Sequence, residues 1–190
     1  MKIPALLLLN AALLLGACAK NDMLISSGDR YVASTDISET YALGAGDKIR
    51  MTVFSEPALS GEFSVSSDGD LSLPLIGNVP VVSKTLDQVT VQVQSLLANG
   101  YLRDPKVNME IVAYRPFFVL GEVKAPGQYP YASGMTVMNA VATAEGYTPR
   151  ATKKTIYIRR FGEKVEQVYE LTPNLRVWPG DTLRVAERYF

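Results

Sequence analysis

The chain has 190 residues, and its 19 Lys and Arg residues balance 19 Asp and Glu residues, so its formal net charge at pH 7 is zero. This balance argues against nucleic acid as a partner, because nucleic-acid binding needs a basic face that neutralises phosphates. The sequence contains no His, which excludes Ser-His-Asp and Cys-His catalysis. Its single Cys excludes an internal disulfide and a thiolate metal cluster, and we expect neither a metal nor another cofactor.

The N-terminus is typical of a secreted lipoprotein. Residues 3–15 form a largely apolar run that is too short to span a bilayer as a helix, as expected for a secretory signal. The run ends in Leu-Gly-Ala-Cys at residues 15–18, which resembles the bacterial lipobox, where cleavage before the cysteine leaves it N-terminal and lipid-modified. We therefore predict a lipoprotein signal peptide over residues 1–17 and lipid attachment at Cys18, against the alternative of a buried thiol. The absence of Asp at the next position, Ala19, resembles lipoproteins passed on to the outer membrane.

Residues 18–40 are predicted to form the lipidated N-terminus and a linker. From Lys20 to Thr40 polar residues dominate, and the few apolar residues follow no clear helix or strand period. The sequence does not decide whether part of this linker packs against the folded domains.

The organisation changes at Tyr41, where strand signals begin. A turn at Gly46-Asp47 precedes residues 49–53, in which apolar and polar residues alternate as in a half-buried strand. The Asp68-Gly69 pair predicts a hairpin between the alternating run before it and the return run over residues 71–75.

Helix and strand signals complete this first domain. Thr85 and Gln88 have the spacing of a capping box, and apolar residues recur at helical intervals from there to Gly100. Apolar and polar residues alternate again over residues 107–111, which predicts a final strand. The block is an α+β unit.

The motifs of this unit resemble those of the polysaccharide export (PES) domain, the N-terminal signature of outer-membrane polysaccharide export proteins. The resemblance is carried, in order and spacing, by Gly46-Asp47, Ser67-Asp68-Gly69, Leu-Pro-Leu-Ile-Gly at residues 73–77 and Asp-Pro-Lys-Val at residues 104–107. We identify residues 41–113 as a PES domain.

A second α+β unit is predicted over residues 116–188. Residues 117–123 are apolar and β-prone, and Pro126-Gly127 favours a type II turn in which the glycine takes a positive φ before residues 128–131 return as a strand. A short helix is expected over residues 136–146, ended by a glycine in the left-handed conformation.

The end of the second unit repeats a turn of the first. Residues 155–160 and 165–171 predict a hairpin, and Gly180-Asp181 then leads into a strand. The same order of residue types occurs at Gly46-Asp47 and at Gly180-Asp181: a Gly-Asp pair, one polar residue, and then an apolar residue, Arg and an apolar residue. We interpret this echo as recurrent turn chemistry rather than a duplicated fold, because the surrounding patterns do not align.

The second unit resembles an SLBB domain, a soluble ligand-binding module of β-grasp type. The resemblance is carried by Val-Leu-Gly-Glu-Val at residues 119–123, Pro-Gly-Gln-Tyr at residues 126–129 and the helix that closes on Glu145-Gly146-Tyr147. Glu145 stands where the family often has a glycine. The predicted fold class is therefore α+β, with a PES domain followed by a β-grasp-like SLBB domain over residues 116–188.

Tyrosines are the candidate ligand-contacting residues. Aromatic faces stack on sugar rings, so Tyr114, Tyr129, Tyr131 and Tyr147 are candidate glycan contacts. Tyrosines also serve in cores and subunit interfaces, and this alternative stays open for each of them.

Charged residues give weaker signals. Asp68 and Asp70 are paired carboxylates, which a glycosidase needs, but turn formation explains them better. Arg159 and Arg160 suit an inter-subunit or anionic-sugar contact, or a solvated strand end. We expect no catalytic residues and no enzyme activity.

The family resemblance implies a role in export of an exopolysaccharide or capsule. It implies a homo-oligomeric ring, lipid-anchored on the periplasmic face of the outer membrane, that takes polymer from an inner-membrane polysaccharide co-polymerase. The sequence stops after its last predicted strand and is identified as a short form without the family's C-terminal transmembrane helix. A separate component, such as a β-barrel, is then expected to cross the membrane.

Two alternatives remain open. One is a monomeric glycan-binding envelope lipoprotein without channel activity. The other is a glycan hydrolase whose activity depends on Asp68 or Asp70.

Overall fold

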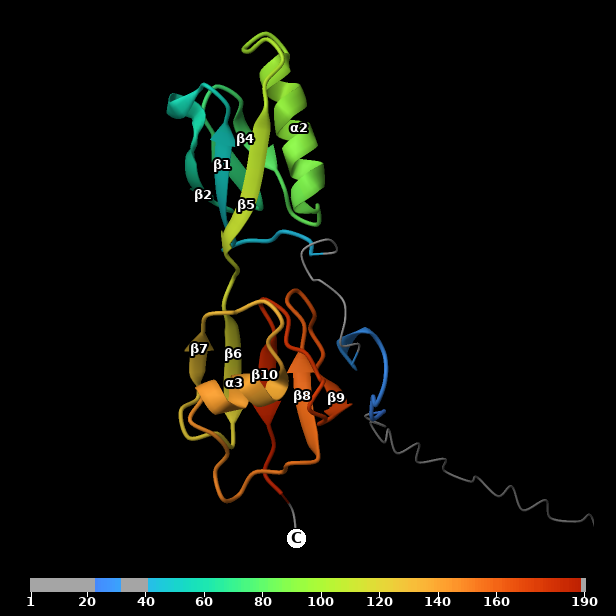
Figure 1. Ribbon diagram of the computed structural model, residues 1–190. Coiled ribbons are helices and arrows are strands. Elements are labelled where there is room, and N and C mark those ends of the chain that lie inside the picture. Colours follow the sequence, from blue (N-terminus) through green and yellow to red (C-terminus); the bar gives the residue numbers. More distant parts are fainter. Residues whose placement is uncertain (1–22, 32–40, 189–190) are drawn as a thin grey trace, which may run out of the picture.

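The computed structural model describes residues 23–31 and 41–188, which form two domains joined by residues 114–116 (Figure 1). The predicted signal peptide and Cys18 lie outside the described residues. The elements of the first domain are β1 (Lys48–Val53), the 3-10 helix η2 (Pro57–Leu59), β2 (Gly61–Ser64), β3 (Asp70–Leu73), β4 (Gly77–Pro80), α2 (Leu86–Ala98) and β5 (Val107–Ala113). Those of the second are β6 (Phe117–Gly121), β7 (Gly127–Tyr129), α3 (Val137–Thr143), β8 (Thr155–Arg159), β9 (Gln167–Glu170) and β10 (Thr182–Val185). The predicted α+β class is confirmed.

The first domain packs α2 against two small antiparallel sheets. One sheet has the order β2-β1-β5, and the other is the β3-β4 hairpin. Side chains of β1 alternate between exposed and buried, so Ile49, Met51 and Val53 enter the core, as the alternating sequence predicted. The predicted helix is confirmed with its capping box, in which Thr85 and Gln88 bond each other's backbone N–H groups.

The predicted hairpin around Asp68-Gly69 is wrong in its pairing. The tight turn is present, with the Gly69 N–H donating to the Ser66 carbonyl over 3.1 Å, but β2 pairs with β1 while β3 pairs with β4. At this turn the chain passes from the sheet that contains β2 to the β3-β4 hairpin. The return strand also ends at Leu73 and not at Leu75, because Leu75 takes a positive φ of 66° in the β3-β4 turn.

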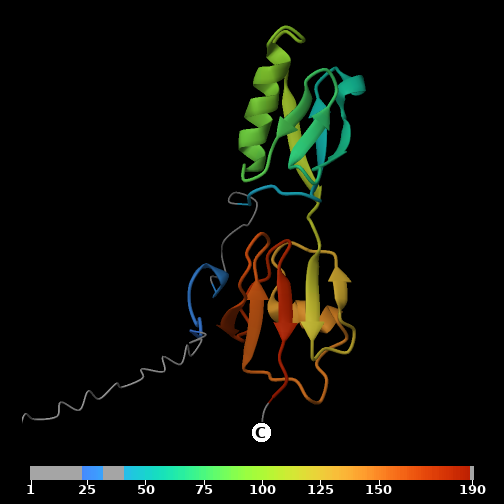
Figure 2. The ribbon, with the colours of Figure 1, turned by 180° about the vertical axis from the view of Figure 1, so that it is seen from behind.

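The second domain is a mixed five-stranded sheet with α3 across one face. The strand order is β7-β6-β10-β8-β9, and only β6 and β10 run parallel. Figure 1 shows α3 in front of the sheet, and Figure 2 shows the opposite face, which no helix of the described residues covers. Phe117, Val119 and Leu183 are completely buried in the core that α3 shares.

The β6-β7 hairpin is confirmed, but its predicted type II turn is wrong. Gly127 lies inside β7, paired with Val119, and the positive φ belongs to Gly121 at 83°. A Cβ at Gly121 would lie 2.1 Å from the Val185 carbonyl oxygen, so strand β10 passes too close for any other residue. The predicted glycine stop of α3 is wrong by one residue: Glu145, directly after the C-cap Ala144, takes the left-handed conformation with a φ of 62°, and Gly146, with a φ of 86°, follows it.

Part of the predicted linker is attached to the second domain. Residues 23–31, which we call the N-terminal strap, lie beside β9 (Figure 1) and include the 3-10 helix η1 (Asp29–Tyr31). Ile25 forms a parallel bridge there, because its N–H donates to the Val168 carbonyl and its carbonyl accepts from the Glu170 N–H, both over 2.8 Å. No helix within residues 23–31 and 41–188 has the length and apolar character to cross a membrane.

Candidate functional site

The two Gly-Asp turns have the same local structure. In the first, the Gly44 N–H donates to Asp47 Oδ2 over 2.8 Å, and the Asp47 N–H donates back to the Gly44 carbonyl over 3.2 Å. In the second, the Trp178 N–H donates to Asp181 Oδ2 over 2.8 Å, and the Asp181 N–H donates back to the Trp178 carbonyl over 3.1 Å. Each turn leads into a central strand of a different sheet, so the echo is turn chemistry on two distinct topologies.

Asp47 connects the first domain to the inter-domain segment. Its carboxylate is fully buried and accepts from the Tyr41 hydroxyl over 2.8 Å and from the Arg115 N–H over 2.7 Å. Burial, together with the Asp47 charge, raises the pKa of the Tyr41 hydroxyl well above its ordinary value, so Tyr41 stays a donor. Three donors hydrogen-bond this carboxylate: the Tyr41 hydroxyl and the backbone N–H groups of Gly44 and Arg115. The Arg115 guanidinium forms an ion pair with it at 3.7 Å.

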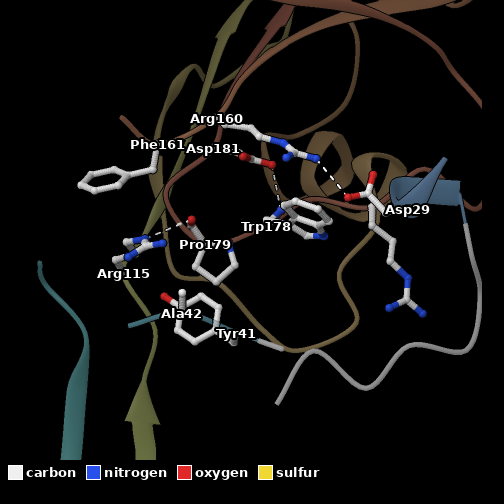
Figure 3. A pocket seen from close by; sticks show the side chains of 10 residues that line it. Asp29, Tyr41, Ala42, Arg115, Arg160, Phe161, Trp178, Pro179 and Asp181 are labelled. Atoms are coloured by element: carbon white, nitrogen blue, oxygen red, sulfur yellow. Dashed lines mark hydrogen bonds and ion pairs between the residues drawn. The ribbon is translucent and has the colours of Figure 1, made fainter. Parts of the chain in front are cut away.

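Arg115 extends this contact into the second domain. Its Nε–H donates to the Pro179 carbonyl over 3.1 Å, and its guanidinium carbon lies 4.6 Å from the Phe161 ring centroid (Figure 3). A Cβ at Gly44 would lie 1.7 Å from Arg115 Nη1, and one at Gly180 would lie 2.9 Å from its Nε. The glycines of the two turns therefore leave room for the same arginine.

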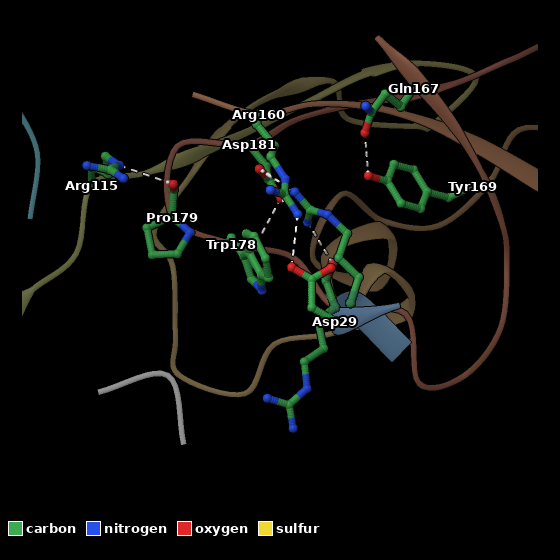
Figure 4. Close-up of polar contacts among 10 residues, drawn as sticks. Asp29, Arg115, Arg160, Gln167, Tyr169, Trp178, Pro179 and Asp181 are labelled. Atoms are coloured by element: carbon green, nitrogen blue, oxygen red, sulfur yellow. Dashed lines mark hydrogen bonds and ion pairs between the residues drawn. The ribbon is translucent and has the colours of Figure 1, made fainter. Parts of the chain in front are cut away.

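Asp181 holds the N-terminal strap through a buried ion pair. The two Nη groups of Arg30 donate to its carboxylate over 2.7 and 3.2 Å, and the side chains are 1% and 2% exposed. Burial raises the pKa of the Asp181 carboxyl, against the attraction of Arg30 and the Trp178 N–H, which lower it. Figure 4 shows Trp178 beside Asp181, and the Arg30 guanidinium carbon lies 4.3 Å from the Trp178 ring centroid.

A pocket of about 510 Å³ lies where the strap, the first domain and the second domain meet (Figure 3). Three arginines from different parts of the chain line it: Arg115, Arg160 and Arg176. Three aromatic residues also line it: Tyr41, Phe161 and Trp178. This size is within the range of small-molecule sites, and the pocket is the strongest candidate ligand site among the described residues.

The predicted glycan-contacting tyrosines lie elsewhere and are largely packed. Tyr131 is 8% exposed and meets the Tyr114 ring edge-on at 5.4 Å, and Tyr114 meets Tyr41 in the same way at 5.0 Å. This row of three rings crosses the domain junction, and the burial of Tyr131 leaves it no free face for a sugar. Tyr129 and Tyr147 are half-buried against the second core, and the Tyr129 hydroxyl donates to the Ala125 carbonyl. The packing alternative therefore describes Tyr131 best.

The paired carboxylates lie at the turn between β2 and β3. Asp68 is exposed, and the Asp70 N–H donates to the Ser66 hydroxyl oxygen over 3.1 Å. Neither residue lines the pocket described above. The turn accounts for both residues, as the sequence indicated.

Sequence reasoning missed most of the pocket. The sequence singled out Arg160 but not Arg115, Arg176 or Trp178, which also line the pocket. It did not indicate Arg30 either, which pairs with the lining residue Asp181. The Gly-Asp turns were the available signal, since each marks a buried carboxylate that needs cationic partners. Those partners are distant in sequence, because Arg115 is 68 residues from Asp47 and Arg30 is 151 residues from Asp181.

Comparison with known proteins places the two domains in named families. Residues 35–112 match the family described as polysaccharide biosynthesis/export protein, and residues 116–169 match the SLBB domain. The chain therefore belongs to the outer-membrane polysaccharide export family, with a polysaccharide export domain followed by an SLBB domain.

Curated relatives agree with this assignment. The chain is 35% identical over 156 residues, 73% of its length, to the exopolysaccharide production protein ExoF of Rhizobium meliloti, of which the match covers 36%. It is 29% identical over 163 residues, 80% of its length, to the EPS I polysaccharide export outer membrane protein EpsA of Ralstonia nicotianae, covering 42% of that protein. It is 25% identical over 167 residues, 82% of its length, to the polysialic acid transport protein KpsD of Escherichia coli, covering 30%.

The chain thus spans about a third to two fifths of the length of these relatives. Their names describe production, export and transport of polysaccharides rather than a catalysed reaction.

Proposed function

We propose that the chain is a lipoprotein of the outer membrane's periplasmic face, attached through Cys18, that works in polysaccharide export as a ring of identical subunits. In this proposal the ring receives polymer from an inner-membrane polysaccharide co-polymerase and passes it to the outer membrane. The observation that carries the proposal is the polysaccharide export domain followed directly by an SLBB domain.

The junction between the domains suits a subunit of a ring. A ring with head-to-tail interfaces needs subunits of defined shape, since each one presents two different surfaces to its neighbours. Residues 114–116 connect β5 to β6. Within this connection Arg115 contacts both domains, because its N–H donates to Asp47 of the first and its Nε–H donates to the Pro179 carbonyl of the second. The chain is thereby held as one body that can repeat around an axis.

The uncovered face of the five-stranded sheet supports contact between subunits. On β6 the side chains alternate, so Phe118 and Leu120 point away from the buried Phe117 and Val119 that face α3. Phe118 is 39% exposed and Leu120 is 44% exposed. Neighbouring apolar side chains on an open sheet face are typical of protein contacts, which favours the ring over the monomeric alternative.

The mass of the detergent-solubilised protein, measured by light scattering, tests the ring. We expect a discrete multi-subunit particle both for the full chain and for Cys18→Ser, because the contacts are placed in the folded domains. Leu120→Lys is expected to reduce the mass to that of smaller species, since a charge on this sheet face opposes burial. Val165→Lys, at a residue 70% exposed between β8 and β9, is the matched control and should keep the particle.

A monomer for the full chain and for Cys18→Ser would contradict the ring. It would favour the alternative, a monomeric glycan-binding envelope lipoprotein, for which the arginine and aromatic residues of the pocket are the supporting observation.

A further inference from the structure

We infer that the pocket between the domains binds a sugar residue that carries a carboxylate. The inference rests on the proposed function, which supplies a polysaccharide as the source of such a residue. The argument starts from the hydrogen-bonding state and charge of the arginines that line the pocket.

Arg160 has unused capacity to bind an anion. Its Nε is buried and has no hydrogen-bond partner among the described residues, and a buried donor without a partner is unfavourable. Its Nη2 reaches Asp29 at 3.2 Å, but the Asp29 side chain is 66% exposed, so solvent screens this pair. An oxygen atom of a ligand in the pocket would satisfy the Nε–H.

The charges around the pocket favour an anion. Among the described residues that line the pocket or form ion pairs with its lining, there are four arginines, Arg30, Arg115, Arg160 and Arg176, and three aspartates, Asp29, Asp47 and Asp181. The two buried aspartates are already engaged by Arg30 and Arg115. A guanidinium can bind a carboxylate through two parallel hydrogen bonds, and Arg160 is the pocket arginine whose buried Nε–H is left to donate one.

Both Trp178 and Phe161 contact arginines, and Phe161, whose ring centroid lies 4.6 Å from the Arg115 guanidinium carbon, is also exposed to the pocket. Trp178 positions cations, because the guanidinium carbons of Arg160 and Arg30 lie 4.2 and 4.3 Å from its ring centroid. Phe161 is 56% exposed and offers an apolar surface at the edge of the same pocket. A sugar acid has both features that this arrangement selects, a carboxylate for the arginines and an apolar ring face for Phe161.

Isothermal titration calorimetry with digalacturonate, a disaccharide with two carboxylates, tests this site on the detergent-solubilised full chain. We expect digalacturonate to bind with an affinity that falls as salt is added. The neutral disaccharide cellobiose should not bind. Arg160→Gln should weaken binding at least about tenfold, because it removes a hydrogen-bonded charge. Arg50→Gln is the matched control, since Arg50 lies on β1 and pairs with Glu62 and Glu110, and it should bind as the unchanged chain does.

A second variant separates a sugar site from a general anion site. Phe161→Ala keeps every arginine but removes the ring that Arg115 contacts at 4.6 Å, so acetate, which has a carboxylate and no sugar ring, is titrated as the control. We expect Phe161→Ala to weaken the binding of digalacturonate and to leave the affinity for acetate unchanged. The inference would be overturned if digalacturonate did not bind, or if cellobiose bound equally well. It would also be overturned if Arg160→Gln bound digalacturonate as tightly as the unchanged chain. Binding of a polyglutamate peptide in place of digalacturonate would overturn it too, in favour of an acidic protein partner.

Secretion of polymer by cells distinguishes a failure of this inference from a failure of the proposed function. If the chain supports secretion but does not bind digalacturonate, only the pocket inference is lost. If digalacturonate binds with the expected dependence on Arg160 while secretion does not need the chain, the site stands and the export role is lost.

Discussion

Replacing Arg30 with Ala is expected to lower the free energy of unfolding of the second domain by about 3–5 kcal/mol, which is typical for removing one partner of a buried ion pair. The change leaves Asp181 as an uncompensated charge at a site that is 1% exposed. It also removes the bond from Arg30 Nη1 to the Arg176 carbonyl, which is 3.1 Å long. The strap should then leave β9.

Urea unfolding followed by fluorescence measures this effect, because Trp178 is the only Trp and lies beside the ion pair. Arg50→Ala is the control, since that arginine is exposed and its loss should change stability little. Limited proteolysis should also cut residues 23–31 faster in Arg30→Ala. A loss of stability below about 1 kcal/mol, with unchanged proteolysis, would contradict the buried pair.

Asp47→Ala is expected to have the second large effect, a loss of about 3 kcal/mol or more. The carboxylate accepts hydrogen bonds from the Tyr41 hydroxyl and from the backbone N–H groups of Gly44 and Arg115. Each buried donor left without a partner costs about 1–3 kcal/mol. Because Arg115 also reaches Pro179, the junction between the domains should loosen together with the first domain.

Scanning calorimetry of the full chain measures this loss. Asp47→Asn keeps one acceptor oxygen and should lose less stability than Asp47→Ala. Asp68→Ala is the control, because Asp68 lies exposed at a turn and should change the transition little. Equal transitions for Asp47→Ala and Asp68→Ala would show that Asp47 does not hold the junction.

Elements with local signals were predictable from the sequence. The capping box at Thr85 and Gln88 and the apolar period of α2 are both contained within one helix, and the structure reproduces them. The alternation in β1 is equally local and gives the buried positions directly. In such segments neighbouring residues contain the whole signal.

Elements that depend on distant partners were not predictable in the same way. The turn at Asp68-Gly69 is present, but a local turn signal does not specify which strands pair. In the structure β2 pairs with β1, and β3 pairs with β4. The pocket depends on ion pairs between residues 68 and 151 positions apart, and no local period encodes such a pair. The apolar residues of the strap, Met23, Leu24, Ile25 and Tyr31, follow no helix or strand period, and its attachment through Arg30 left no local pattern that distinguishes it from a linker.

The amount of polysaccharide secreted by cells that lack the gene tests the central claim most directly. The account predicts that secreted polymer falls to background in the deletion strain and returns when the full chain is supplied, with Cys18→Ser restoring less because it has no lipid attachment. Arg50→Gln should restore secretion fully. Unchanged secretion in the deletion strain would contradict a role for this chain in polysaccharide export.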